Sequence, residues 1–289
     1  MTITIPAAYV DTFESNVIHL AQQKTSYFRD HVEELNKQSE HHNWDRLGTS
    51  AASVKSTART ASPTSDLAWT RRQTLTATYH VGETVEPEDV AQMLIEPKSA
   101  VARSLAMGMY REVDDVIITA LGGAALDGDG SSVAYTAGQK IGGGTTIISI
   151  DTILEADEKF NSNDVDPDES KVWAYGPTQK RKLMQLLEIT SKDFQPDPSK
   201  GLGTGALPNT MGFLWVMSNR LNVPSTGEID NMAWCKEAMG LHVSNDIWAR
   251  VAERPDLSFA WQFYCAMSIA CVRVQDEKVV KVHLKDALS

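Results

Sequence analysis

The feature that most constrains this 289-residue chain is a change of pattern within residues 46–82. Residues 46–68 are rich in Ser, Thr and Ala and hold almost nothing to bury. The run that follows, WTRRQTLTATYHVG, alternates Leu75, Tyr79 and Val81 with polar residues, as in a half-buried strand. A polar segment that returns as an amphipathic strand predicts an extended hairpin. Such a hairpin is too thin to have a core of its own, so its partners must lie outside it.

A long helix is the second strong signal. Apolar residues recur at three- and four-residue steps between residues 97 and 121, and a Gly-Gly pair ends the pattern. The stripe contains Val101, Leu105, Met109, Val113, Val116, Ile117, Ala120 and Leu121. We expect Leu105, Met109 and Val113 to face the body of the protein. Arg111 lies three and four residues before Asp114 and Asp115, which predicts ion pairs on an exposed face.

The remaining chain mixes helices and strands. Narrow apolar stripes predict helices at residues 9–20 and 27–35, and Pro97 separates a short helix at 87–95 from the long one. The other expected elements are a Gly-rich loop at 122–147, a strand at 145–150, a helix capped by Asp151 that runs to about Asn161, a strand at 171–175, a helix from Pro177, a loop at 190–211, and strands at 212–217, 232–235, 261–269 and 280–284. This order predicts an α+β fold.

The charge argues against a dedicated nucleic-acid binder, because the formal net charge is −11. The distribution is uneven. Residues 53–82 carry four basic residues against one acidic residue, whereas residues 83–130 carry three basic residues against ten acidic ones. Two solvated faces would explain this pattern, and so would two surfaces that meet between chains.

Sequence motifs offer no convincing catalytic, cofactor or metal site, so we do not expect an enzyme. The run GLGTGA at 201–206 lacks the strand and helix of a dinucleotide loop, and the acidic residues within 164–168 lack the Gly and Glu of a calcium loop. Cys235, His242 and Asp246 have the residue types of a nucleophile set, but no motif in the sequence connects them. Three scattered Cys residues favour a reducing compartment, and we expect neither a signal peptide nor a membrane helix.

Taken together, the chain resembles the major capsid proteins of tailed bacteriophages, which have the Hong Kong 97-type fold. The resemblance is carried by RRQTLTATYHVGETVEPEDV, by PKSAVARSLAMGMYREVDDVIITALGG and by GALPNTMGFLWVMSNRL, and it extends from about residue 7 to residue 286. Each motif alone is loose, but their order and spacing are more specific.

The resemblance implies a division into four parts. Residues 1–45 would be the N-terminal arm, residues 46–82 the E-loop, residues 83–147 the peripheral domain with its spine helix, and residues 148–255 the axial domain. A strand near 256–286 would join the peripheral domain. In this fold the E-loop lies over a neighbouring subunit, so intersubunit contacts are expected at Arg71, Arg72, Leu75, Tyr79 and Val81. The spine helix would carry Leu105, Met109, Arg111, Val113 and Asp114.

The resemblance also implies partners. Hexamers and pentamers would form an icosahedral phage head, assembled in the host bacterial cytoplasm, that encloses double-stranded DNA without binding it specifically. A separate scaffolding protein and a portal are expected, and a cement protein is left open. Lys55 is the only Lys in the E-loop segment, and we expect a non-covalent shell. Two alternatives stay open: an encapsulin-like nanocompartment and, in a different class, a small cytosolic hydrolase that uses Cys235.

Overall fold

The computed structural model describes residues 22–59, 64, 66–86, 98–186, 207 and 212–287. The predicted helices at 9–20 and 87–95, Pro97 and nearly all of the loop at 190–211 lie outside these residues. The chain divides into two compact units. Unit 1 contains residues 1–26, 78–112 and 245–268, and unit 2 contains residues 27–77, 113–244 and 269–289.

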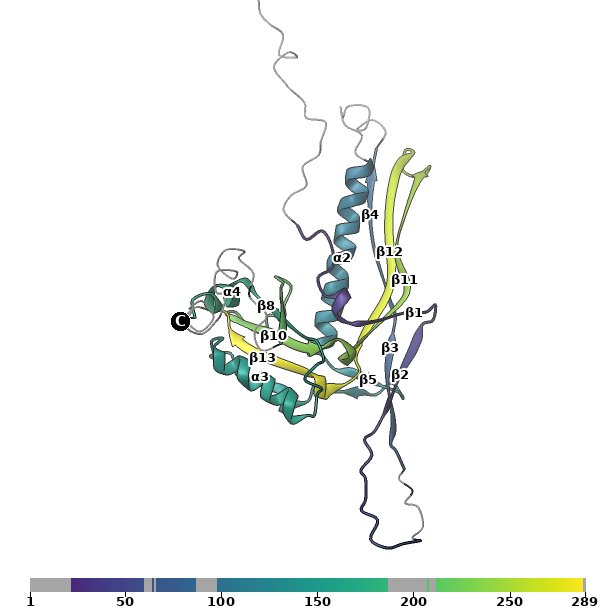
Figure 1. Cartoon of the computed structure of the whole chain (residues 1–289). Helices are drawn as coiled ribbons and strands as arrows, with labels where there is room; N and C mark the ends of the chain where they lie inside the picture. Colours follow the sequence, from purple (N-terminus) through teal and green to yellow (C-terminus); the bar gives the residue numbers. More distant parts are fainter. Residues whose placement is uncertain are drawn as a thin grey trace, which may run out of the picture. The chain divides into compact units, whose positions relative to one another are not determined.

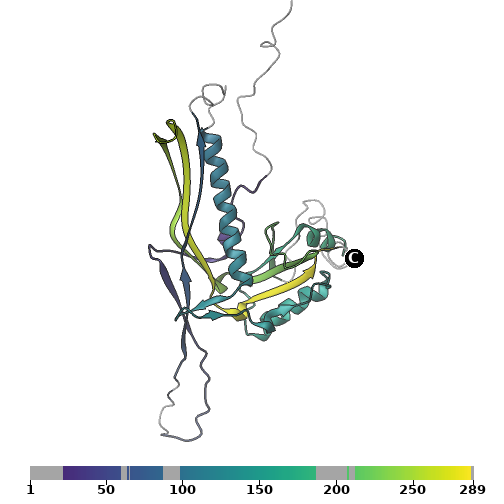
Figure 2. The same ribbon diagram turned by 180° about the vertical axis from the view of Figure 1, so that it is seen from behind.

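In its described residues, unit 1 combines part of one helix with strands of a single sheet (Figures 1 and 2). Its helical part is the first half of α2 (Lys98–Gly122), which follows the predicted spine helix closely. Strand β4 (Ala77–Val85) and the outer parts of β11 (Met239–Arg254) and β12 (Ala260–Arg273) form its sheet. β4 lies next to β12, and a Cβ added to Gly82 would come within 3.2 Å of the Phe263 carbonyl oxygen. The long strand β12 was expected, whereas β11 was missed.

Unit 2 is built on a five-stranded sheet in the order β7-β13-β10-β8-β9. These strands are β7 (Lys140–Ile141), β8 (Lys171–Tyr175), β9 (Phe213–Met217), β10 (Glu228–Cys235) and β13 (Val279–Lys285). β8 to β10 and β13 agree with the predicted strands. Every residue of β8 is buried. On the aromatic face of the sheet, Phe160 of α3 (Ile150–Ser162) contacts Phe213.

Several local predictions were wrong. Residues 145–150 form no strand; the amide of Thr146 donates to the Gly143 carbonyl in a turn, and Ser149 then caps α3. The cap is Ser149 rather than Asp151, because Ser149 and Thr152 form a reciprocal capping box. α4 (Pro177–Leu183) begins at Pro177 as predicted, and Leu183 is buried.

The N-terminal helix predicted at 27–35 is also wrong. The chain makes a short 3₁₀ turn, η2 (Arg29–His31), and then β1 (Glu33–Asn36), which pairs in parallel with residues 240–243 of β11. Pairing with a distant strand overrides the weak helical period of this segment. Within residues 122–147, which were expected to be a loop, the chain forms short pieces of structure. These are β5 (Ala125–Asp127), β6 (Ser132–Val133), η3 (Ala137–Gln139) and β7.

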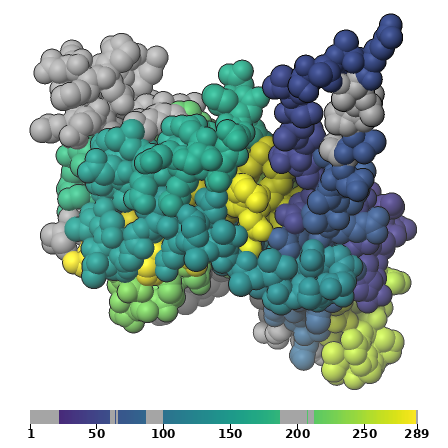
Figure 3. Space-filling model, turned by 90° about the horizontal axis from the view of Figure 1, so that it is seen from below, coloured from purple at the N-terminus to yellow at the C-terminus, as the bar shows by residue number. Residues whose placement is uncertain are grey.

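A third sheet, in the order β2-β3-β5-β6, carries the predicted hairpin. β2 (His41–Leu47) pairs antiparallel with β3 (Trp69–Leu75), from His41 opposite Leu75 to Leu47 opposite Trp69. The hairpin strands thus begin at His41, five residues before the start expected from composition. Figure 3 shows the purple-to-blue hairpin of unit 2 as a narrow projection.

Candidate functional site

The two faces of the β2–β3 hairpin differ sharply. On β2, the odd-numbered residues from His41 to Leu47 are exposed, and the even-numbered residues between them are half-buried. On β3, Arg72 and Thr74 are buried, whereas Trp69, Arg71 and Leu75 are exposed. We call the exposed side, with Asp45, Leu47, Trp69, Arg71 and Leu75, the outer face of the hairpin.

The outer face presents a cross-strand apolar pair. Trp69 is 72% exposed and its register partner Leu47 is 52% exposed. Two pairs further along the ladder, on the same face, Arg71 Nε donates to Asp45 Oδ1 at 2.6 Å, and both of these side chains are largely exposed. Exposed Trp and Leu side chains on a ribbon without a core are what an intersubunit contact requires.

The inner face is fixed within the chain. Trp44 packs against a small apolar cluster of Ala125, Val272 and Val274. Thr74 Oγ1 donates to the His42 carbonyl at 3.2 Å. Arg72 is 4% exposed and donates from Nη2 to Asp276 Oδ2 at 2.8 Å. Arg72 is therefore engaged in its own subunit, whereas Arg71 is exposed on the outer face.

The strand predicted across residues 72–81 is two strands in two sheets. In β4, Tyr79 and Val81 are half-buried and their neighbours are exposed, as predicted. In β3 the predicted faces are reversed, because β3 pairs with β2 and β5 while β4 lies beside β12. Burial, followed by the charge of Glu112, raises the pKa of Tyr79. Contacts of Leu75, Tyr79 and Val81 with a neighbouring subunit stay a prediction.

The spine helix places its predicted residues on α2. Met109 and Val113 are buried and Leu105 is partly buried. In unit 1, Arg111 Nη1 donates to Gln22 Oε1 at 2.7 Å. The exposed face predicted for Asp114 was wrong. This residue is fully buried in unit 2, where its carboxylate accepts the backbone N–H groups of Tyr27, at 3.0 Å, and of Phe28, at 3.2 Å.

Asp115 has a different partner from the one predicted. Its Oδ1 accepts from Arg220 Nε at 2.6 Å, and the same two side chains make a second contact through Arg220 Nη2. Buried Asp114 holds the segment that enters unit 2, whereas Asp115 holds the segment after β9. The sequence spacing suggested local pairs; the structure gives both carboxylates distant partners.

A catalytic role for Cys235 does not fit the structure. Its side chain is buried, and burial, followed by the charge of Glu169, raises the pKa of the thiol to about 12. A nucleophilic thiol needs the opposite shift. The candidate base His242 lies with Nε2 2.8 Å from the Lys37 carbonyl oxygen and Nδ1 3.4 Å from Thr74 Oγ1.

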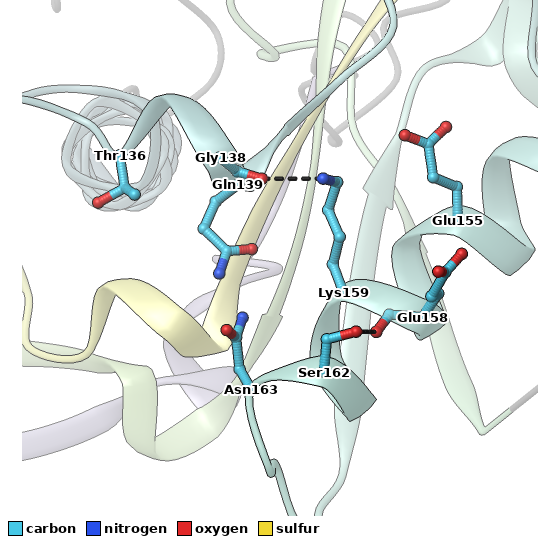
Figure 4. A pocket seen from close by; sticks show the side chains of 8 residues that line it. All are labelled: Thr136, Gly138, Gln139, Glu155, Glu158, Lys159, Ser162 and Asn163. Atoms are coloured by element: carbon cyan, nitrogen blue, oxygen red, sulfur yellow. Dashed lines mark hydrogen bonds between the residues drawn. The ribbon is translucent and has the colours of Figure 1, made fainter.

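Other chemistry finds little support in the described residues. Among them, no group of three or more His, Cys, Asp or Glu side chains could hold a metal ion. A surface pocket of about 440 Å³ is lined by polar residues of α3 and η3, where Lys159 Nζ donates to the Gly138 carbonyl at 2.8 Å (Figure 4). Within the described ranges of the chain, no helix is long and apolar enough to cross a membrane.

Leu47, Trp69 and Asp276 were not singled out from the sequence. Trp69 opens the alternating run, and its side chain points to the same side of the strand as those of Arg71 and Leu75, which was the available signal. That side of the strand was interpreted as facing inward. Only the β2–β3 register shows that Leu47 lies opposite Trp69.

Comparison with known proteins gives one consistent result. The family model for phage capsid proteins matches residues 5–286. No curated protein matches the sequence. Among solved structures, the capsid of Cyanophage P-SCSP1u is similar at a TM-score of 0.75 and 14% identity, covering 95% of this chain and 92% of that chain.

Two further structures agree. The capsid of Cyanophage Pam1 has a TM-score of 0.74 at 13% identity, with 100% of each chain covered. The structure from Mycobacterium phage Che8 has a TM-score of 0.72 at 16% identity, covering 94% of this chain and 96% of that chain. This chain has the Hong Kong 97-type capsid fold and belongs to the phage capsid protein family, as a structural major capsid protein.

Proposed function

We propose that this protein self-assembles into hexamers and pentamers that close an icosahedral phage head around double-stranded DNA. The observation that carries the proposal is the outer face of the hairpin, where Leu47 and Trp69 lie exposed on a ribbon whose other side is fixed to unit 2. A single subunit gains nothing from exposing a Trp in this way, whereas a shell of identical subunits buries it many times.

The contact across subunits would involve the outer face and the half-buried residues of β4, Tyr79 and Val81. The basic residue Arg71 adds charge complementarity with the acidic segment of residues 83–130 in a neighbour, which favours correct orientation and rate of association. Burial of an exposed Trp supplies more affinity than such a rim charge. The shell is non-covalent in this proposal.

The acidic subunit would enclose DNA without gripping it, since a net charge of −11 opposes non-specific binding to phosphates. Filling the head then needs other components: a separate scaffolding protein during assembly, a portal for DNA entry, and in some heads a cement protein. The protein would act without catalysis, in the virion, after assembly in the host bacterial cytoplasm.

Electron microscopy of the purified chain tests the proposal. We expect closed particles, or hexamers and pentamers when the scaffolding protein is absent. A stable monomer under all assembly conditions would contradict it. The nucleic-acid content of particles from the natural source distinguishes a phage head from a nanocompartment filled with protein cargo.

A further inference from the structure

The carboxylate of Asp276 lies between two buried guanidinium groups in unit 2. Asp276 begins η5 (Asp276–Lys278), the short turn between β12 and β13. Its Oδ2 accepts from Arg72 Nη2 at 2.8 Å, and its Oδ1 accepts from Arg273 Nε. Arg273 is 0% exposed, and Arg72 is nearly as buried. We call Arg72, Arg273 and Asp276 the Asp276 node.

On one side the node holds the end of the spine helix. Arg273 Nη1 donates to the carbonyls of Gly123, at 2.8 Å, and of Leu121, at 3.3 Å. Carbonyls at a helix C-terminus have no partner within the helix, and a cation there also meets the negative end of the helix dipole. The guanidinium of Arg273 also lies 4.7 Å from the centre of the Tyr135 ring, close enough for a cation–π interaction.

On the other side the node holds the base of the hairpin. Arg72 belongs to β3, so its bond to Asp276 ties that strand to the connection between β12 and β13. The opposite strand has a parallel tie, because Arg46 Nη1 donates to the Val274 carbonyl at 3.0 Å. The same short connection therefore anchors both hairpin strands and, through Arg273, the end of α2.

The charges make Asp276 the critical member. Two buried cations share one carboxylate, that of Asp276, whose side chain is 13% exposed. The second acid near Arg72, Asp127, is 3.8 Å away with its side chain 41% exposed. Arg72 Nε and Arg273 Nη2 are buried without a hydrogen-bond partner in the described part of the chain. Without the carboxylate, two like charges would face each other in a site that water cannot screen well.

We propose that Asp276 is a positioning residue for assembly, which fixes the base of the hairpin to the end of the spine helix. The hairpin outer face is then presented in one orientation before subunits meet, so less ordering is left to the association step. This proposal rests on the proposed function for its consequence in assembly. Its structural part, the tie between Arg72 and Asp276, concerns the single chain.

The first test replaces Arg72 by Met, which removes the tie but leaves Asp276 paired with Arg273. We expect hydrogen exchange of the β2 and β3 amides to become about ten-fold faster, because these strands lose their anchor. Exchange in α2 and in the five-stranded sheet should not change, and particle yield should fall about ten-fold by the same loss of preorganisation. Asp127→Asn, at the half-exposed second acid, is the matched control and should change neither measurement.

A second test uses Asp276→Asn alone and combined with Arg72→Met. Asp276→Asn leaves two buried cations together, so it should accelerate exchange in the hairpin and at the end of α2. Adding Arg72→Met removes one cation and should slow exchange at α2 again, a non-additive result that a simple loss of packing does not give. If Asp276→Asn fails to fold, Arg72→Met and its control still decide the question.

Three outcomes would overturn the proposal or its basis. Unchanged hydrogen exchange of the hairpin in Arg72→Met would show that the bond between Arg72 and Asp276 does not anchor the hairpin. Faster exchange throughout the chain would show that Arg72 only stabilises the fold in general. Faster hairpin exchange with unchanged particle yield would show that Asp276 has no positioning role in assembly. Failure of the wild-type chain to form any particle would instead contradict the proposed function, while the exchange data on the single chain would still stand.

Discussion

The five-stranded sheet and the β2–β3 hairpin, both in unit 2, differ in how much of their surface the chain itself buries. Along β8 all five residues are buried, and seven of the eight residues of β10 are buried. In the hairpin, one face is held by polar contacts of Arg46, Arg72 and Thr74, and the other face is exposed. The strands of the sheet are buried within their own unit, whereas the hairpin has intrachain contacts on one face only.

Replacing one tryptophan in the sheet and one in the hairpin tests the difference between these two regions most directly. Trp173 in β8 is 0% exposed, and its ring contacts those of Phe213 and Trp215. Trp173→Ala should lower the free energy of unfolding by about 3–5 kcal/mol, because it removes a large buried side chain and leaves a cavity. Chemical denaturation of the subunit measures this loss. A change below about 1 kcal/mol would show that the sheet is not the stabilising core of unit 2.

A pH titration examines the polar side of the same sheet. Asp230 is buried; burial alone would raise its pKa, but hydrogen bonds from Lys281, His283 and Asn222 outweigh burial and lower it. Because the folded-state pKa lies below the ordinary value of 3.8, this carboxylate stabilises the fold above about pH 4. The stabilisation should disappear as the pH falls through the folded-state pKa.

Asp230→Asn provides the comparison. At neutral pH it should lower the free energy of unfolding by about 2 kcal/mol, the typical loss when a hydrogen-bonded charge is replaced. Between pH 5 and pH 3 the stability of this variant should fall less steeply than that of the wild type. Parallel curves for the two proteins would show that Asp230 does not contribute to the acid sensitivity.

Trp69 is the counterpart of Trp173 on the hairpin. Trp69→Ala should change the free energy of unfolding of the subunit by less than about 0.5 kcal/mol, because the side chain is mostly exposed. Particle yield should nevertheless fall, since a contact that every subunit repeats would be lost. Leu154→Ala, at another exposed apolar residue, is the control that should leave the yield unchanged. A normal yield from Trp69→Ala would remove the outer face from the assembly contact.

These contrasts also explain which parts were predictable from the sequence. Buried strands such as β8 and β13 are continuous apolar or alternating runs, and a local pattern identifies them. The faces of β3 could not be identified, because the buried Arg72 pairs with Asp276, about two hundred residues away in the chain, and also lies near Asp127. A local alternation of Arg and Thr with Leu would ordinarily place the polar residues outside.

The candidate site was predictable in part for the same reason. Its location in the segment around Arg71 and Leu75 followed from the lack of a hairpin core, and the family followed from a resemblance over most of the chain. The cross-strand pair of Leu47 and Trp69 depends on the strand register, and Asp114 depends on a distant turn at Tyr27. Contacts set by long-range pairing leave no trace in local periodicity.

The smallest expected effect concerns Arg71, which pairs with Asp45 on the outer face. Both side chains are at least half exposed, so the pair should contribute only about 0–1 kcal/mol to subunit stability. Arg71→Glu should therefore leave subunit unfolding nearly unchanged but slow assembly, most strongly at low salt, where the charges of neighbouring subunits are least screened. Light scattering at several salt concentrations measures this rate.

Lys236→Glu makes the same change in net charge at an exposed position outside the hairpin and should have no comparable effect. Combining Arg71→Glu with Asp45→Arg restores the hairpin charge and should restore the rate. If the combined variant stays slow, Arg71 itself contacts the neighbour; if Arg71→Glu has no effect at any salt concentration, the basic and acidic segments are two solvated faces.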